Sequence, residues 1–534
     1  MREVRTHASS ASHALVVGLG IFLSRVAGLV RERAFAHYFG NSVAADAFRA
    51  AARIPNLLQN LLGEGVLSAS FIPVYARLRA QGREEEATRL ASAVGAVLAV
   101  TVSVLVALGV LASPWLVELL APGFEAERRS TTVLLVRILF PGIGCLVLSA
   151  WCLGVLNCHG RFFLAYAAPI AWNLAQIAAL VAGSHYVSGR WLAQWLSWGA
   201  VAGSLLQLVI QLPTVLRLLG GFRPALRRVR GPIQEVARNF IPVLFSRGVI
   251  QLSAYVDSVI ASWLPVGAVA ALAYGQILYL LPVSLFGMAI TAAELPEMSS
   301  VVGTADEVKT ALRQRLEKSQ VRMAFLVLPA CVVFAVLGDV VASALFQTGQ
   351  FTPSDAVYVW TILGGATLGL LGITRARLYS SAFYALGDTR TPLHFSLARL
   401  TLGAGLGWLL ALRLPGWIGL AASWGAAGLT LAASVAGWLE FWGLRRSLHA
   451  RIGAVAIGRP NWTRLWLATG LSALLAVGLR WPLPSMAGLR PWLIGCLLLV
   501  PYALSYWGIA WVLGLEPARS LAYSLVHRLR NRAP

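Results

Sequence analysis

Several arginines lie within or beside long apolar segments instead of in the polar stretches between them. They are Arg25, Arg31, Arg33, Arg49, Arg53, Arg137, Arg247, Arg375, Arg377 and Arg399. A guanidinium group binds carboxylate or phosphate oxygens through two parallel hydrogen bonds. At the centre of a bilayer it costs about 2.5–3.5 kcal/mol on insertion scales. Four of these arginines lie near expected helix ends, where snorkelling explains them: Arg137, Arg375, Arg377 and Arg399. Arg25, Arg49 and Arg53 require a buried role.

Polar residues in the segment 43–70 recur along one face of the expected helix. They are Asp46, Arg49, Arg53, Asn60 and Glu64. At 100° per residue they lie within about 60° of one another, although Pro55 makes the phases beyond it approximate. Such a stripe must face protein or water. One interpretation is a salt-bridge ladder of its first three residues that locks helices together. The other is a cavity for an anionic ligand, because arginines outnumber acids once Arg25, Arg31 and Arg33 are added.

A second stripe lies in the segment 236–264. It starts from Arg247, and Gln251, Tyr255, Ser258 and Ser262 fall within about 80° of that arginine. Asp257 lies off this stripe, on the other side of the arginine. It could hold a cation or a proton, or it could form only a hydrogen bond to a neighbouring helix.

The composition indicates what kind of protein positions these residues. Of the 534 residues, 58% are hydrophobic and only 12% are charged, and the mean hydropathy is +0.71. This excludes a soluble enzyme, a DNA-binding module and a disordered chain, because too few polar residues are present to cover a soluble surface. The five cysteines form no Cys-x-x-Cys pair, so they are interpreted as small buried hydrophobic residues.

Hydropathy predicts an all-α integral membrane protein with about 14 transmembrane helices. The expected spans are 14–38, 43–70, 91–113, 131–156, 162–183, 191–216, 236–264, 268–292, 322–345, 356–385, 393–412, 416–443, 462–480 and 490–514. The net charge is +22, and the basic residues concentrate in the even-numbered loops and both tails. Positive loops stay on the cytoplasmic side, so both termini are predicted to be cytoplasmic.

Two weak repeats divide the spans into two sets of six. Phe22 to Arg25 is similar to Leu244 to Arg247, and Ser68 to Pro73 is similar to Thr291 to Pro296, at nearly the same offset. We therefore expect lobes at 1–225 and 232–450 in a parallel pseudo-twofold repeat, with a site between them. The region 460–534 would add two transmembrane helices and a cytoplasmic tail.

These residues resemble the MurJ/MviN family of lipid II flippases, within the multidrug/oligosaccharidyl-lipid/polysaccharide exporter superfamily. The resemblance covers nearly the whole chain. It rests on Ser24 to Gly28 with Arg31, Asp46 to Phe48, Ile54 to Leu58, Glu64-Gly65, Phe71 to Pro73, Gly154 to Asn157, Gly160 to Phe162, Ala168-Pro169 with Asn173, and above all Phe383 to Pro392.

The resemblance implies transport in peptidoglycan biosynthesis, a step of cell wall biogenesis and cell shape, and not an enzyme. The substrate would be lipid II, an anionic undecaprenyl-pyrophosphate-linked precursor, moved from the inner to the outer leaflet of the bacterial cytoplasmic (inner) membrane by alternating access through a basic central cavity. No cofactor is implied apart from a coupling cation, sodium or a proton, and the membrane potential. Membrane lipids and other cell-wall synthesis proteins are the expected partners of a monomer, with no nucleic acid.

The family's cavity residues carry over to particular positions of this sequence. Its cavity arginines carry over to Arg25 and Arg31, and its acidic and amide positions carry over to Asp46, Asn56 and Glu64. The polar stripes add Arg49, Arg53, Arg247 and Gln251 to the expected substrate-binding residues. Gln59 and Gln276 stand where the family commonly has arginines. The resemblance also implies a coupling-ion site, for which Asp257 and Asp388 are the candidates, although a turn at 387–389 explains Asp388 equally well.

Four alternatives remain open on the sequence alone. The first is a flippase for another polyprenyl-pyrophosphate-linked glycan. The second is a multidrug/cation antiporter of the same superfamily, which the basic stripe argues against. A non-transporting membrane scaffold would not need charges buried mid-membrane. An integral membrane enzyme is disfavoured because no metal cluster, phosphate-binding loop or nucleophile–base constellation is found, and no metal site is expected.

Overall fold

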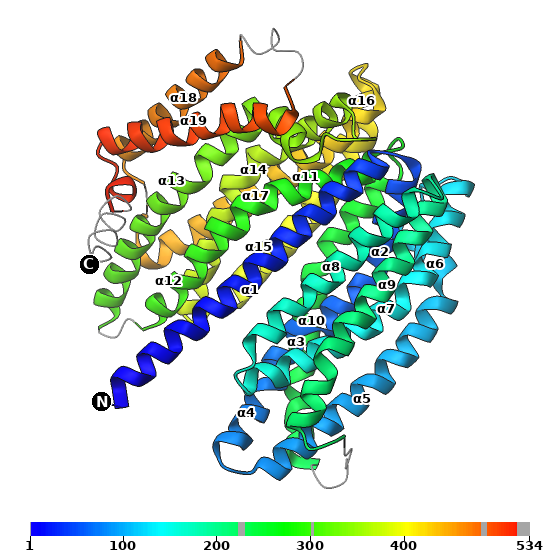
Figure 1. Ribbon diagram of the computed structural model, residues 1–534. Coiled ribbons are helices and arrows are strands. Elements are labelled where there is room, and N and C mark those ends of the chain that lie inside the picture. Colours follow the sequence, from blue (N-terminus) through cyan, green and yellow to red (C-terminus); the bar gives the residue numbers. More distant parts are fainter. Residues whose placement is uncertain (1, 223–229, 301–303, 456, 482–488, 521–534) are drawn as a thin grey trace, which may run out of the picture. The chain divides into compact units, whose positions relative to one another are not determined.

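The computed structural model describes residues 2–222, 230–300, 304–455, 457–481 and 489–520, and the side chains at 2–18, 230, 245–254 and 305 lie outside that description. Every described element is a helix (Figure 1). The helices are α1 (Arg2–Phe39), α2 (Val43–Leu62), α3 (Glu64–Ser70), α4 (Ile72–Ala80), α5 (Glu84–Leu111), α6 (Ser113–Leu120), α7 (Ala126–Cys158), α8 (Phe162–Ser184), α9 (Gly189–Leu218), α10 (Arg230–Ser262), α11 (Ala268–Pro282), α12 (Ala289–Ser299), α13 (Ala305–Phe346), α14 (Pro353–Ala385), α15 (Arg390–Trp408), α16 (Leu414–Trp417), α17 (Gly425–Ile452), α18 (Arg459–Arg480) and α19 (Pro491–Val512).

These helices confirm the predicted all-helical membrane architecture. Within the described residues, 11 helical stretches are long and apolar enough to cross a bilayer. Helices α1, α10 and α17 lie at the remaining predicted spans, the first, seventh and twelfth. Each predicted span therefore corresponds to a long helix or to helices that follow one another directly.

The second span is interrupted, and the position of the break differs from the one that its proline suggests. Pro55 lies inside α2, which continues to Leu62, and the chain leaves helical geometry at Gly63. A Cβ atom on Gly63 would lie 2.3 Å from the carbonyl oxygen of Gln59, so only glycine fits there. Glu64 then begins the separate helix α3. The predicted polar stripe is consequently divided between two helices, and its phases cannot be continued across the break.

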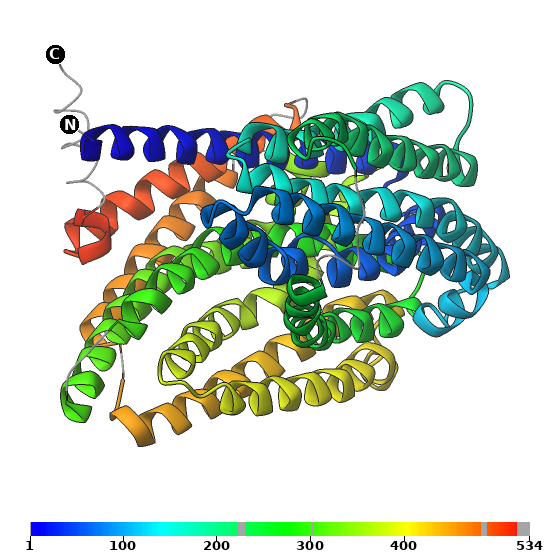
Figure 2. The same ribbon diagram turned by 90° about the horizontal axis from the view of Figure 1, so that it is seen from below.

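The chain forms two compact units. The first comprises residues 1–270 with 348–350, and the second comprises 271–347 with 351–534. In the first unit, α7 packs against α2, α5 and α9, and α8 lies between α1 and α9 (Figures 1 and 2). Among α2, α5, α7, α8 and α9, helix α7 is the most buried, with 61% of its most apolar stretch buried. It therefore forms the centre of the bundle that positions the arginines of α1 and α2.

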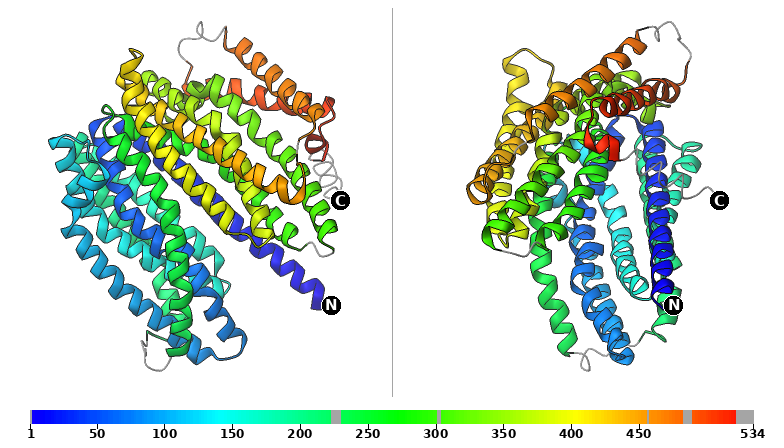
Figure 3. Two further views of the ribbon diagram at one scale, coloured as in Figure 1. Left: turned by 180° about the vertical axis from the view of Figure 1, so that it is seen from behind. Right: turned by 90° about the vertical axis from the view of Figure 1, so that its left-hand side faces the viewer.

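The second unit is built around α14. This helix packs against α13 and α17, while α15 packs on the far side of α17. Helices α18 and α19 pair with each other and lie against α13 (Figure 3). Tyr379, Phe383 and Phe441 are fully buried in the apolar core between these helices. The Tyr506 hydroxyl donates a hydrogen bond of 2.6 Å to the Phe325 carbonyl, which ties α19 to α13.

The central helices of the two units occupy equivalent places in the predicted repeat. Helices α7 and α14 each contain 33 residues, and each is the fourth span of its predicted set of six. The boundaries at 225, 232, 450 and 460 stay a prediction, because the compact units follow packing contacts and not the repeat.

Small residues allow α14 and α17 to approach closely. A Cβ atom on Gly369 would lie 2.4 Å from the Ser434 Cα atom, whereas nothing lies within 4 Å of one on Gly364. The Ser434 hydroxyl also donates a hydrogen bond of 2.7 Å to the Gly365 carbonyl. Close backbone approach of this kind drives helix association in membranes, where burial of apolar surface contributes little.

We predict that Gly369→Ala destabilises the protein by about 1–3 kcal/mol, because the backbone of α17 must move away. Gly364→Ala, on the same helix, should leave stability unchanged or raise it by up to about 1 kcal/mol through helix propensity. Thermal unfolding of both purified variants in detergent measures the difference. Equal midpoints for the two variants would show that the close contact does not stabilise this unit.

Candidate functional site

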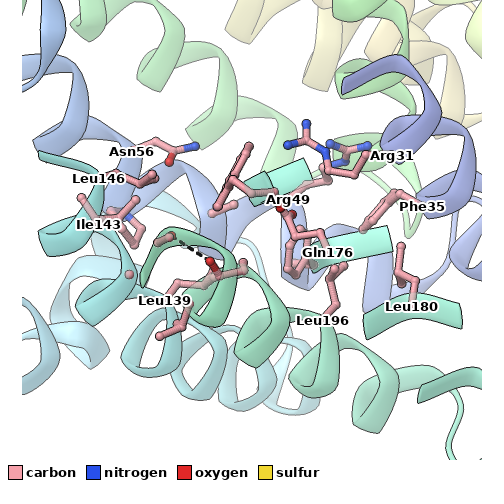
Figure 4. A pocket seen from close by; sticks show the side chains of 18 of the residues that line it. Arg31, Phe35, Arg49, Asn56, Leu139, Ile143, Leu146, Gln176, Leu180 and Leu196 are labelled. Carbon is pink, nitrogen blue, oxygen red and sulfur yellow. Dashed lines mark hydrogen bonds between the residues drawn. The ribbon is translucent and has the colours of Figure 1, made fainter. Parts of the chain in front are cut away.

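A pocket lies among five helices of the first unit. Its space is about 710 Å³, part of which is open to solvent. The pocket is lined by Arg31, Glu32, Phe35, Phe48, Arg49, Ala52, Pro55, Asn56, Leu139, Gly142, Ile143, Leu146, Trp172, Gln176, Leu180, Leu196, Ala200, Val201 and Ser204. These residues come from α1, α2, α7, α8 and α9 (Figure 4). The lining is therefore contributed by membrane-spanning helices and not by loops.

The polar part of the pocket is a carboxylate held between two guanidinium groups. Arg31 donates to Glu32 Oε1 over 2.6 Å, and Arg49 donates to Glu32 Oε2 over 2.5 Å. The side chains are 20%, 14% and 9% exposed for Arg31, Arg49 and Glu32. Two cations and one anion leave the group with a formal charge of +1. A cationic surplus in a low-dielectric pocket attracts an anion.

Aromatic rings fix the two guanidinium groups in the pocket. Arg31 lies over the ring of Trp172 on α8, 4.8 Å from its centroid. Arg49 lies over the ring of Phe35, 4.1 Å from its centroid. Each contact is a cation–π interaction that orients the planar group and leaves its edge available for hydrogen bonds.

The remaining lining separates into a polar and an apolar part. Figure 4 shows Arg49 between Arg31 and Asn56, with Leu139, Leu180 and Leu196 on the opposite side. The indole Nε1 of Trp172 is buried and has no hydrogen-bond partner in the described part of the chain. The pocket thus presents cations and amides to a ligand, beside an aliphatic wall.

Asp46 lies outside this pocket, in a fully buried ion pair. Its carboxylate accepts a hydrogen bond of 3.1 Å from Arg128 on α7. It also accepts hydrogen bonds of 2.7 Å from the Gly267 amide and 2.8 Å from the Ala270 amide. Three protein donors account for both oxygens. The alternative ladder of Asp46, Arg49 and Arg53 does not form, because Asp46 pairs with Arg128 and Arg49 with Glu32.

Arg53 lines a different pocket from Arg49. This second pocket has a space of about 330 Å³, part of which is open to solvent, and it is lined by Phe124 and by residues of α2, α6, α10 and α11, with Tyr255 among them. The Tyr255 hydroxyl donates a hydrogen bond of 2.7 Å to the Arg53 carbonyl. The stripe predicted along α2 is therefore separated into three environments, for Asp46, Arg49 and Arg53.

The other predicted substrate-binding residues are placed as follows. Asn56 lines the first pocket and is exposed. Arg25 on α1 and Glu64 at the start of α3 are exposed, and neither lines either of these pockets. Gln59 and Gln276 are half-buried. The side chains of Arg247 and Gln251 lie outside the described residues. Substrate binding by Arg25, Asn56, Glu64, Arg247 and Gln251 stays a prediction, and so does the interpretation of Gln59 and Gln276 as departures from the family's arginines.

The two candidates for a coupling-ion site lie in different compact units. Asp257 is half-buried on α10. Asp388 lies in the turn before α15, where it accepts from the Arg390 and Thr391 amides, the Thr391 hydroxyl and Arg451. The hydrogen bonds from Thr391 hold the pKa of Asp388 well below its usual range. These contacts describe a capped turn, which is the alternative that the sequence offered for Asp388.

The arginines assigned to helix ends do not all behave alike. Arg137 donates to the Ser113 hydroxyl over 2.9 Å, and Arg399 pairs with Glu440 over 3.1 Å. Arg375 is only 7% exposed, so the prediction that it snorkels is wrong.

Sequence reasoning missed Glu32 and Arg128. Glu32 stands between Arg31 and Arg33, and the sequence analysis considers those two arginines without it. The sequence does contain a signal for Glu32, which is a single acid flanked by arginines inside an apolar helix. Such an acid is the nearest available counterion for those arginines. Arg128 was assigned to a loop, and no local pattern links it to Asp46, which lies 82 positions earlier.

The arrangement suits the binding of an anion. Within the described residues, no group of three or more His, Cys, Asp or Glu side chains could hold a metal ion. The two guanidinium groups can bind phosphate oxygens once their carboxylate partner is displaced.

Comparison with known proteins assigns a family to this architecture. The family model described as lipid II flippase MurJ matches residues 35–500. The lipid II flippase MurJ of Burkholderia cenocepacia is 31% identical over 522 residues, which cover 93% of this chain and 96% of that protein. A probable lipid II flippase MurJ of Rhizobium meliloti is 32% identical over 436 residues, which cover 79% of this chain and 78% of that protein.

Solved structures share the fold. A structure of the lipid II flippase MurJ in an inward closed conformation has a TM-score of 0.73 at 21% identity, covering 93% of this chain and 98% of that one. An inward-facing multidrug resistance MATE family transporter of the MOP superfamily has a TM-score of 0.61 at 15% identity, covering 81% and 96%.

Asp46→Asn should destabilise the folded protein by about 3–5 kcal/mol, because it leaves Arg128 buried without a counterion. Glu118→Gln is the matched control, since it removes the exposed partner of the neighbouring Arg129 and should cost less than about 1 kcal/mol. Unfolding midpoints and membrane abundance measure both effects. Wild-type stability in Asp46→Asn, combined with lost transport, would instead make Asp46 a ligand-binding residue.

Proposed function

We propose that this chain, which belongs to the MurJ family of lipid II flippases, moves lipid II from the inner to the outer leaflet of the bacterial cytoplasmic membrane by alternating access. The observation that carries the proposal is the pair Arg31 and Arg49, held with Glu32 in a pocket between membrane-spanning helices. A lipid-linked pyrophosphate presents oxygens that match guanidinium groups, and its head group needs such a polar compartment inside the membrane.

Glu32 makes this site reversible. In the described structure its carboxylate accepts hydrogen bonds from both arginines. A phosphate group that enters the pocket competes with Glu32 for those donors. On release the carboxylate pairs with the arginines again, so the empty carrier does not leave two buried guanidinium groups unmatched. An exchange of this kind favours turnover over tight binding, as a transporter requires.

The membrane orientation follows from the charge distribution. We place both termini in the cytoplasm, because the basic residues concentrate in the loops on that side. Two six-helix lobes at 1–225 and 232–450 would move relative to each other, with 460–534 as an additional part. The transporter would act as a monomer and could contact other cell-wall synthesis proteins.

Return of the empty carrier is the step at which an ion could contribute. Moving one elementary charge across the membrane is worth about 2.3 kcal/mol per 100 mV. A cation bound at Asp257, either sodium or a proton, would offset negative charge carried inward. Asp257 is the better candidate because it lies on the membrane-spanning helix α10, whereas Asp388 lies in the turn before α15.

Two other transport functions are compatible with the same architecture. A flippase for another polyprenyl-pyrophosphate-linked glycan would use the same phosphate contacts. A multidrug/cation antiporter shares the fold, but the cationic surplus beside Glu32 favours an anion.

Rescue of a bacterium depleted of its lipid II flippase tests the proposal. The wild-type gene should restore growth and cell shape. Arg49→Gln should lower transport about 10-fold or more, because a charge-assisted hydrogen bond of about 1.5–3 kcal/mol is lost. Arg49→Lys should rescue only in part, since a point charge replaces a fork.

Arg129→Gln, which removes an exposed arginine of α7, is the matched control and should rescue fully. Membrane abundance of each variant separates transport from folding. Full rescue by Arg49→Gln would exclude the pocket as the substrate site, and failure of the wild-type gene would favour a different glycan.

A further inference from the structure

The second unit contains a buried arginine for which the proposed transport cycle has no use. Arg375 lies on α14 and is 7% exposed. No ion pair to it is found among the described residues. It cannot reach the polar surface of the membrane by snorkelling, because it is buried within the bundle. Its positive charge therefore has to be matched inside the unit.

Neutral groups hold the Arg375 guanidinium in place. Its Nη2 donates to Gln320 Oε1 on α13 over 2.5 Å. The group lies 4.3 Å from the ring centroid of Phe441 on α17 and 5.8 Å from that of Trp462 on α18. These contacts connect four helices, but none of them supplies a negative charge.

The surroundings of Arg375 hold further donors without acceptors. Four buried atoms have no hydrogen-bond partner in the part of the chain that the structure describes: Arg375 Nε, Gln320 Nε2, the Tyr379 hydroxyl and Arg445 Nε. The Tyr379 hydroxyl interacts with Gln320 and Arg375 at marginal hydrogen-bond geometry and interacts electrostatically with Arg375 and Arg445. This one neutral oxygen is shared among several donors and supplies no negative charge. The nitrogen atoms can only donate, so an acceptor is missing from this cluster.

The single carboxylate of α17 is already engaged. Glu440 accepts a hydrogen bond of 2.9 Å from the Ser396 hydroxyl and one of 3.1 Å from Arg399. A water molecule would satisfy some donors but would leave Arg375 and Arg445 uncompensated. Buried charges are matched by an opposite charge, and buried donors by acceptors.

We propose that Arg375, Gln320, Tyr379 and Arg445 form a binding site for a small inorganic anion such as chloride. A halide accepts hydrogen bonds from several directions and supplies one negative charge. The ligand must be small, because Gln320 and Tyr379 are completely buried and Phe441 and Trp462 flank the guanidinium. The anion links α13, α14 and α17 and stabilises the second unit, and it is not transported.

Thermal unfolding of the full-length protein in detergent tests this site. Chloride replaces gluconate at constant sodium and ionic strength, with bromide and phosphate as parallel series. The wild-type midpoint should rise saturably with chloride and bromide and not with phosphate. Arg375→Gln should lose that rise. Arg446→Gln, at an exposed position of the same helix as Arg445, and Arg49→Gln, in the first unit, should retain it.

Gln320→Glu keeps the test decisive if Arg375→Gln does not fold. The new carboxylate would occupy the anion's place beside Arg375, so this variant should be stable in gluconate and insensitive to halide. A wild-type midpoint that is the same in chloride and gluconate would overturn the proposal in favour of water. Equal stabilisation by phosphate and by halide would exclude a small-anion site. If Arg49→Gln alone lost the rise of the midpoint with halide, the anion would instead bind in the first unit.

Discussion

A charged side chain inside a membrane-spanning bundle must be matched, and this constraint determines how the helices of this protein are joined. Asp46 matches Arg128 between α2 and α7. Glu440 also pairs with the partly exposed Arg399 between α17 and α15, and Asp339 pairs with the exposed Arg480 between α13 and α18. Removing one partner of a buried pair is far more costly than removing both, so the pair of Asp46 and Arg128 specifies that α2 and α7 lie together.

The same constraint distinguishes the proposed site from the rest of the bundle. Asp46 serves one buried arginine, whereas Glu32 serves two. The remaining positive charge is what an anionic head group can use. The same requirement for opposite charge therefore explains both helix pairing and ligand binding. A cluster with balanced charges joins helices, and a cluster with a positive surplus can bind an anion.

Much of the fold could be predicted from the sequence, because hydropathy over about 20 residues is a local property. The long helices lie at the predicted spans, and the family resemblance agrees with the family model that matches residues 35–500. The break in the second span was harder to locate. Pro55 is tolerated inside α2, while the close approach of the Gln59 carbonyl requires the break to fall at Gly63.

The partners of the buried charges could not be predicted in this way. A helical wheel places residues on the face of one helix but does not say which helix that face meets. Asp46 and Arg49 were assigned to one stripe, yet they face Arg128 and Glu32 respectively. The role of Glu32 depends on two arginines from two helices, and only the packed bundle brings them together.

The most direct test of this account compares Glu32→Gln with the wild-type protein for lipid II binding in detergent and for lipid II transfer in reconstituted vesicles. If Glu32 is the counterion that the substrate phosphate displaces, its removal should tighten binding by about 10-fold, or 1.4 kcal/mol. Transfer across the bilayer should become slower, because release no longer has a competitor. Unchanged binding with wild-type transfer would contradict the exchange, and would leave Glu32 as a structural residue.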